Sequence, residues 1–115
     1  MKKIAIFAFQ GELMCFAHAL LNVLDLHARG LQAKLVIEGS ATKLIAQLAD
    51  PETPFHRQYQ QVISEKLLAG ICKACAGKMG TLEEAKKQGI ALLDDMSGHP
   101  GFAGWIAEGY DIISM

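Results

Sequence analysis

The sequence has little charge, and its two signs nearly cancel. Charged residues make up 20% of the 115 residues, whereas roughly 25% is usual for a globular domain. Eleven Lys and Arg stand against twelve Asp and Glu, so the formal net charge is −1. Such a chain lacks the basic field that binding to nucleic acid or to an anionic membrane surface requires. We therefore expect no nucleic-acid partner.

Long apolar runs are also missing. The run Ile4–Phe9 follows Lys2 and Lys3 as the core of a signal peptide would, but it ends at Gln10. A membrane-spanning helix needs about 18 consecutive apolar residues, and cleavage of a signal peptide here would remove a strand-like segment. We expect a cytoplasmic protein with no membrane partner.

Cysteine is scarce, with Cys15, Cys72 and Cys75 as its three copies. Thiols stay reduced in the cytoplasm, so these residues do not indicate a disulfide framework. They are reactive, metal-binding or simply buried.

Apolar residues, by contrast, are abundant at 51% of the chain. This content argues against intrinsic disorder, and the length suits a single domain over residues 1–115. A monomer of 12.5 kDa would have difficulty burying so much apolar surface. We expect a homo-oligomer.

Strand-like and helical patterns alternate along the chain. The expected strands are Ile4–Phe9, Ala33–Ile37, Leu67–Cys72, Ile90–Leu93 and Asp111–Met115. Several of these runs are continuously apolar, which is typical of strands covered on both faces. The alternation predicts an α/β fold with a mainly parallel five-stranded sheet and helices on both of its faces.

Local signals define the helices between these strands. The longest is expected over Glu12–Arg29, with an apolar stripe and, on the opposite side, a polar stripe that contains His18. The apolar stripe consists of Leu13, Ala17, Leu20, Leu24 and Ala28. Ser40, Thr53 and Thr81 are expected to be the N-caps of shorter helices. The fourth helix begins near Lys73, and the last spans Phe102–Glu108.

Polar and reactive residues follow the expected strands. Parallel-sheet folds place their ligands and catalytic groups outside the carboxyl ends of the strands. Four segments reach this edge: Gln10–Glu12, Glu38–Ser40, Cys72–Cys75 and Asp94–His99.

Cys72-Lys73-Ala74-Cys75 is the most specific motif at this edge. A thiol at a helix N-terminus is stabilised as thiolate by the dipole and by free backbone N–H groups, and Lys73 adds positive charge. The pattern favours disulfide exchange or persulfide formation. The alternative is a pair of buried small residues in a tight strand–helix turn.

A zinc site is another interpretation of the cysteines. Structural zinc takes four ligands, and Cys15 with His18 is available as a second pair beside Cys72 and Cys75. Nothing in the spacing requires the two pairs to meet, so we assign no metal ligand and no cofactor. We expect Cys15 to pack inside and His18 to lie on the polar stripe.

Gly11, Gly39 and Ser40 lie in strand–helix turns that could hold a phosphate group. Neither turn has a dinucleotide-binding or P-loop pattern, and the same residues also serve turn geometry. His99 follows the fourth strand and stands either near Cys72 or simply ahead of Pro100 at the start of a helix.

Two segments, Ile37–Leu44 and Gly70–Gly80, carry a resemblance that the first and last elements extend over nearly the whole chain. They resemble the DsrE/DsrF-like (TusD-like) family of small sulfur-relay proteins. The resemblance implies a flavodoxin-like three-layer α/β/α sandwich, trimers or hexamers, and a cysteine that carries persulfide sulfur. Cys72 matches that cysteine by its distance from Gly80, and Cys75 matches a second one found in some relatives. Met79 stands where members often have Arg.

The leading hypothesis is therefore a DsrE-like sulfur carrier of the sulfurtransferase type, acting between donor and acceptor proteins. In it, Cys72 accepts sulfane sulfur, Cys75 resolves the persulfide and Lys73 favours the thiolate. The alternative is a non-catalytic oligomeric module that binds a small molecule or anion at the same edge. Its ligand-binding residues are Gly11, Gly39, Ser40 and His99.

Overall fold

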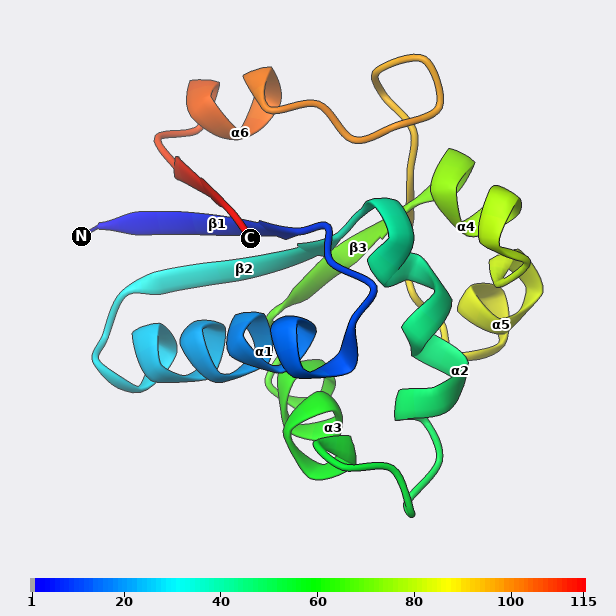
Figure 1. Ribbon diagram of the computed structural model, residues 1–115. Coiled ribbons are helices and arrows are strands. Elements are labelled where there is room, and N and C mark those ends of the chain that lie inside the picture. Colours follow the sequence, from blue (N-terminus) through cyan, green and yellow to red (C-terminus); the bar gives the residue numbers. More distant parts are fainter. Residues whose placement is uncertain (1) are drawn as a thin grey trace.

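A five-stranded sheet in which every pairing is parallel forms the centre of the protein (Figure 1). The computed structural model describes residues 2–115. The strands are β1 (Lys3–Ala8), β2 (Gln32–Ile37), β3 (Leu68–Cys72), β4 (Leu92–Leu93) and β5 (Asp111–Ser114). Their order across the sheet is β4-β3-β2-β1-β5. The predicted α/β class and the five parallel strands are confirmed, and the flanking helices make three layers.

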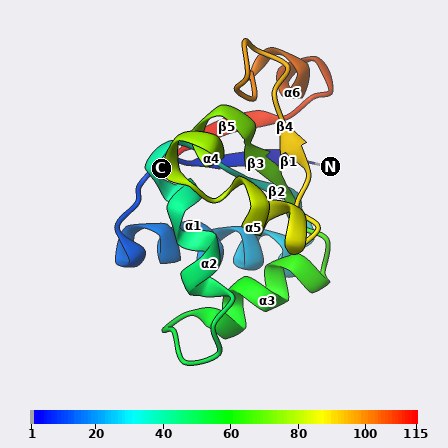
Figure 2. The ribbon, with the colours of Figure 1, turned by 90° about the vertical axis from the view of Figure 1, so that its right-hand side faces the viewer.

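The two faces of the sheet are covered very unequally (Figure 2). One face packs against all the helices that precede β4 in the chain. These are α1 (Leu13–Ala28), the 3₁₀ helix η1 (Gly39–Leu44), α2 (Ile45–Leu48), α3 (His56–Ser64), α4 (Lys73–Met79) and α5 (Leu82–Lys87). Of the described helices, only the short α6 (Ala103–Ala107) lies on the other face.

Two apolar clusters reflect this arrangement. The larger one lies under α1 and α3 and includes Phe16, Leu20 and Tyr59, all fully buried. The smaller one lies under α6, where Phe7 meets Trp105 edge-to-face at 6.4 Å between ring centroids. Helices do flank both faces, but the second layer is one helix thick and short.

The buried face of α1 is rotated from the predicted stripe. Ala17 and Leu20 are buried as predicted, whereas Leu24 is half-buried and Ala28 is exposed. Phe16 and Val23 are buried instead, because the helix packs against β2 and α3 along that side. This rotation leaves Cys15 exposed, so the prediction that it packs inside is wrong, while His18 is exposed as predicted.

Of the three predicted N-caps, Thr81 does precede α5 at its N-cap position, whereas Ser40 and Thr53 do not hold that position, and none of the three side chains makes the capping hydrogen bond. Each hydroxyl donates instead to a backbone carbonyl farther away: Ser40 to Phe9 (3.1 Å), Thr53 to Gln47 (2.6 Å) and Thr81 to Thr42 (2.9 Å). These bonds fasten loops to one another, and in the folded chain they replace the local caps that the sequence favours. α3 starts at His56 rather than at Pro54, directly after Phe55, whose positive φ of 70° lies outside the helical region.

β4 is shorter than predicted. Ile90 turns into the larger cluster, and only Leu92 and Leu93 pair with β3. The close approach to β3 explains why that strand contains a glycine. A Cβ on Gly70 would lie 2.6 Å from the carbonyl oxygen of Ala91, a separation that no other residue tolerates.

The described helices also bear on the membrane prediction. Over residues 2–115, none of them combines the length and the apolar character that crossing a lipid bilayer requires.

Candidate functional site

Four side chains meet at the carboxyl edge of the sheet. They are Glu38 after β2, Cys72 at the end of β3, Cys75 in α4 and His99 in the loop after β4. Their ligating atoms all lie within 4.8 Å of one another. Three of the four segments predicted to reach this edge therefore build one cluster, which we call the thiol cluster. The fourth segment, Gln10–Glu12, contributes no side chain to it.

The strand–helix junction positions the two sulfurs. Cys72 is both the last residue of β3 and the N-cap of α4, and its Sγ accepts a hydrogen bond from the backbone N–H of Cys75 at 3.3 Å. The three-residue spacing is what allows an N-cap side chain to reach this donor. Cys72 is fully buried, and Cys75 is half-buried.

A tight turn brings His99 to the sulfurs. Met96 and His99 exchange two backbone hydrogen bonds, and the residues between them, Ser97 and Gly98, have φ of 51° and 91°. Positive φ at both central positions is the geometry of a type I′ turn. The turn docks on α4 because the N–H of Ala74 donates to the Gly98 carbonyl at 2.9 Å. His99 Nδ1 then lies 3.1 Å from Cys72 Sγ and 3.6 Å from Cys75 Sγ.

Replacing the glycine of this turn should destabilise the protein. In Gly98→Ala, residue 98 must keep its positive φ with a side chain present, and the new methyl group lies 3.3 Å from the Ala74 Cβ. We therefore expect a loss of about 1–2 kcal/mol in the free energy of unfolding. Denaturant melts would measure it. The matched control is Gly104→Ala in α6, where a Cβ meets nothing within 4 Å and a gain of up to about 1 kcal/mol is expected. Equal effects of the two changes would contradict this account of the turn.

Glu38 is the member of the thiol cluster that the sequence analysis did not select. Its carboxylate is buried, accepts the N–H of Gly39 at 2.9 Å and lies 3.4 Å from Cys75 Sγ. It belongs to no ion pair among the described residues. An acidic residue directly after a continuously apolar strand was the available signal.

The thiol of Cys72 is strongly biased toward its protonated form. Burial raises the pKa of the Cys72 thiol to about 12, and the nearby Glu38 carboxylate acts in the same direction. The N–H of Cys75 opposes the shift but is outweighed. The ammonium group of Lys73 pairs with Asp94 at 3.7 Å, and Lys73 is not among the groups that shift the Cys72 pKa. The predicted lowering of the Cys72 pKa is therefore wrong.

A cavity of about 420 Å³ opens beside the thiol cluster. Glu38, Cys75 and His99 form its polar wall, and its apolar wall includes Phe9, Met96 and Phe102. Cys72 does not line it, so Cys75 is the sulfur that a molecule in the cavity meets first.

The predicted ligand-binding residues divide between this cavity and the loops behind it. Gly39 and His99 line the cavity, whereas Gly11 and Ser40 do not. A Cβ on Gly11 would lie 2.8 Å from the Ser40 carbonyl oxygen, so this pair serves the close packing of two loops. The charged group in the cavity wall is a carboxylate, which disfavours an anionic ligand.

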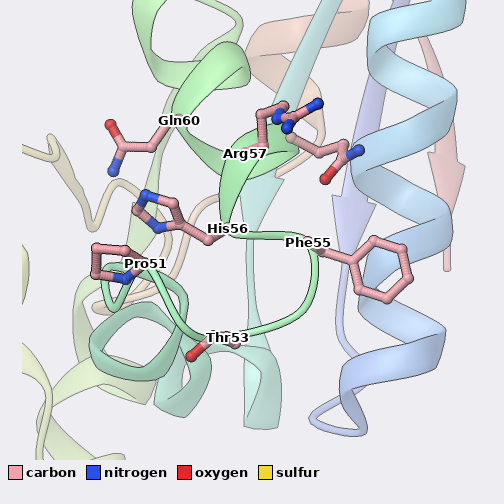
Figure 3. Close-up of a pocket in the computed structure, with 7 residues that line it drawn as sticks. Pro51, Thr53, Phe55, His56, Arg57 and Gln60 are labelled. Carbon is pink, nitrogen blue, oxygen red and sulfur yellow. The ribbon is translucent and has the colours of Figure 1, made fainter.

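A second hollow, of about 480 Å³, lies at the start of α3 (Figure 3). Pro51, His56 and Gln60 are on one side of it, and the ring of Phe55 points away from them (Figure 3). His56 Nδ1 lies 2.7 Å from the Leu48 carbonyl oxygen, as expected for a bond that ties α3 to α2. None of the predicted site residues lies in this hollow.

Comparison with known proteins gives relatives but no activity. An uncharacterized protein of Archaeoglobus fulgidus is 47% identical over 49 residues, which are 43% of this chain and 80% of the relative. The chain belongs to the same family as this archaeal protein. An uncharacterized protein of Methanocaldococcus jannaschii is 26% identical over 106 residues, covering 92% of this chain and 84% of the relative. No protein-family model matches the chain, and no solved structure does so significantly.

Proposed function

We propose that the protein is a sulfur carrier in which Cys75, beside Cys72, holds sulfane sulfur as a persulfide. One observation supports the proposal above the others: a histidine nitrogen lies within 3.6 Å of two thiols, beside a cavity with an apolar wall. An imidazole at this distance can take a thiol proton. An apolar cavity also shields a persulfide from water.

The positions of the two sulfurs reverse the order of events expected from the sequence. Cys72 is buried behind the cavity wall, so Cys75 is the residue that takes sulfur from a donor. Cys72 stays protonated at neutral pH, and its thiol has the Gly98 carbonyl oxygen at 3.9 Å as an acceptor other than His99. His99 is then free to take the proton of Cys75.

The transfer needs no external oxidant or reductant. His99 takes the proton of Cys75, and the resulting thiolate attacks the outer sulfur of a donor persulfide. A new sulfur–sulfur bond forms at Cys75, the donor's sulfur–sulfur bond breaks, and the donor thiolate leaves with the proton from His99. An acceptor thiolate then attacks the outer sulfur of the Cys75 persulfide and releases the Cys75 thiolate.

Mass spectrometry after incubation with a low-molecular-weight persulfide tests the proposal. We expect the mass of one added sulfur atom on the peptide that contains Cys75, and loss of the adduct in Cys75→Ser. His99→Ala should slow loading by about 10²–10⁴-fold, the range for a lost general base. Cys15→Ser is the matched control and should load normally, because Cys15 is exposed and outside the thiol cluster. Undiminished loading of Cys75→Ser would overturn the assignment.

A cytoplasmic location is part of this proposal. Sulfur transfer needs the thiols of Cys72 and Cys75, which lie together in the thiol cluster. Thiols so close together persist in a reducing compartment. Donor and acceptor proteins are the partners that sulfur transfer would require.

We also propose self-association through the thinly covered face of the sheet. Phe102, the N-cap residue of α6, lies one turn before Ile106, and Met96 joins Phe102 across the cavity. All three are large, apolar and exposed, Ile106 at 59%. A second copy of the chain would bury this strip.

A charge on this strip should dissociate the oligomer. We expect Ile106→Glu to sediment as a monomer at concentrations where the unmodified protein is a trimer or hexamer, because a carboxylate cannot be buried unpaired. Met14→Glu is the control, since Met14 is equally exposed but lies on α1, on the other side of the sheet. A monomeric unmodified protein would contradict the proposal.

A further inference from the structure

The geometry points to a metal site: we propose that Glu38, Cys72, Cys75 and His99 together bind one zinc ion. The proposal concerns the affinity of these four side chains for a cation. It does not rest on the proposed sulfur transfer, and it requires neither a sulfur donor nor an acceptor.

The spacing of the donor atoms fits one tetrahedral ion. Zinc bonds of about 2.3 Å to sulfur and about 2.0–2.2 Å to nitrogen or oxygen place two ligand atoms of a tetrahedron roughly 3.3–3.8 Å apart. Cys75 Sγ lies 3.4 Å from Glu38 Oε1 and 3.6 Å from His99 Nδ1, and Cys72 Sγ lies 3.1 Å from the same nitrogen. All pairs fall within 4.8 Å, so small side-chain movements complete the tetrahedron.

The kinds of donor select the metal. Two thiolates, one imidazole and one carboxylate form a set of mixed softness, which suits zinc and disfavours magnesium and calcium, whose ligands are oxygens. The zinc set considered from the sequence shares only its cysteine pair with this one. Glu38 and His99 take the places there given to His18 and Cys15, neither of which is in the cluster.

The buried carboxylate provides an independent argument for a cation. Glu38 is 5% exposed, and its partners are one backbone N–H and one thiol. No lysine, arginine or histidine in the described part of the chain forms an ion pair with it. Buried carboxylates are costly unless they are paired or coordinate a metal. A zinc ion supplies the missing positive charge and bonds to both sulfurs.

The fold holds the four ligands and leaves the ion a way in. The ligands come from the ends of two adjacent strands, one helix and one docked turn, so they are positioned before metal binds. Glu38, Cys75 and His99 line the cavity, and an ion that enters it meets these three before reaching Cys72.

Metal binding by the full-length protein tests the proposal. Protein stripped with a chelator would be loaded with zinc, dialysed and analysed for metal, and cobalt(II) would be added separately to record absorption bands from thiolate coordination. We expect one metal ion per chain, unchanged in Cys15→Ser and abolished in the double variant Cys72→Ser/Cys75→Ser. Glu38→Gln should bind more than about tenfold more weakly. A chain that retains no zinc, or a double variant that retains as much as the unmodified protein, overturns the proposal.

A second measurement avoids any variant that fails to fold. In the unmodified protein, bound zinc should protect Cys75 from alkylation and leave Cys15 reactive. Equal protection of both residues, or of neither, would contradict the assigned ligands. Neither metal binding nor protection from alkylation requires sulfur transfer, so the outcomes of these two measurements are separate from that of the persulfide experiment.

Discussion

Iodoacetamide is expected to alkylate Cys15 and Cys75 in the folded, metal-free protein near neutral pH and to leave Cys72 unmodified. Two properties of Cys72 act together. Its side chain is fully buried, and burial raises its pKa to about 12. At about pH 8 an ordinary thiol, with a pKa of about 8.5, is partly thiolate, whereas a thiol of pKa 12 is thiolate in only about one molecule in 10⁴. The contrast should therefore span several orders of magnitude in rate.

The pH dependence of the Cys72 alkylation rate shows whether the pKa of its thiol is raised or lowered. Because the pKa is raised, the thiolate fraction of Cys72 should still increase tenfold for each pH unit above about pH 9, where that of an unshifted thiol levels off. Peptide mapping after timed alkylation at several pH values measures both the difference in alkylation rate between the cysteines and the pH dependence of that rate. Denatured protein is the control, and in it all three cysteines should react alike. A folded-state rate for Cys72 that levels off near pH 7 would show a lowered pKa and contradict the assignment of Cys75 as the first acceptor.

The parts of the fold that follow from local patterns were predictable. Continuous apolar runs such as Ile4–Phe9 indicate doubly covered parallel strands, and those strands are present within a residue or two. The helix start after Thr81 was predictable, but the hydrogen bonds of Ser40, Thr53 and Thr81 were not, because each hydroxyl reaches a carbonyl that only the tertiary structure brings near. Local capping signals identify a hydroxyl oxygen that can accept a helix N–H, but not the distant carbonyls to which that hydroxyl donates.

The candidate site was predictable as a location and less so as a set of side chains. The rule that sites lie at the carboxyl edge of parallel strands placed Cys72, Cys75 and His99 at one edge. Whether His99 reaches the sulfurs depends on the docking of the 96–99 turn on α4, which depends in turn on a hydrogen bond between Ala74 and Gly98. No pattern within the sequence reports that bond.

The sign of the Cys72 pKa shift was predicted incorrectly for a related reason. A helix N-terminus and a neighbouring lysine both favour a thiolate, and both are visible in the sequence. Complete burial and the buried Glu38 are tertiary effects, and they outweigh the local ones. A sequence motif thus identifies the reactive atoms here, and their surroundings decide which of them reacts.

Zinc and sulfane sulfur are expected to exclude each other, because both proposals use the same lone pairs of Cys75. One equivalent of zinc should abolish persulfide loading of the unmodified protein, and a chelator should restore it. Loading measured by mass spectrometry against added zinc gives the competition directly. An ion that also occupies His99 Nδ1 removes the base that would take the Cys75 proton, so zinc blocks the activation of the thiol as well as the attack.

Glu38→Gln separates the two activities. The carboxylate is a zinc ligand in the proposed site, whereas His99 takes the proton in the proposed sulfur transfer, so this variant should lose zinc affinity by a larger factor than it loses loading rate. It should also need more than about tenfold more zinc for half-inhibition. Sulfur loading that proceeds unchanged with one zinc ion bound would show that the metal binds elsewhere. A metal-free protein that never loads sulfur would contradict the proposed sulfur transfer and leave the proposed zinc site unaffected. The thiol cluster can therefore be assigned to metal binding, to sulfur transfer or to both from one titration.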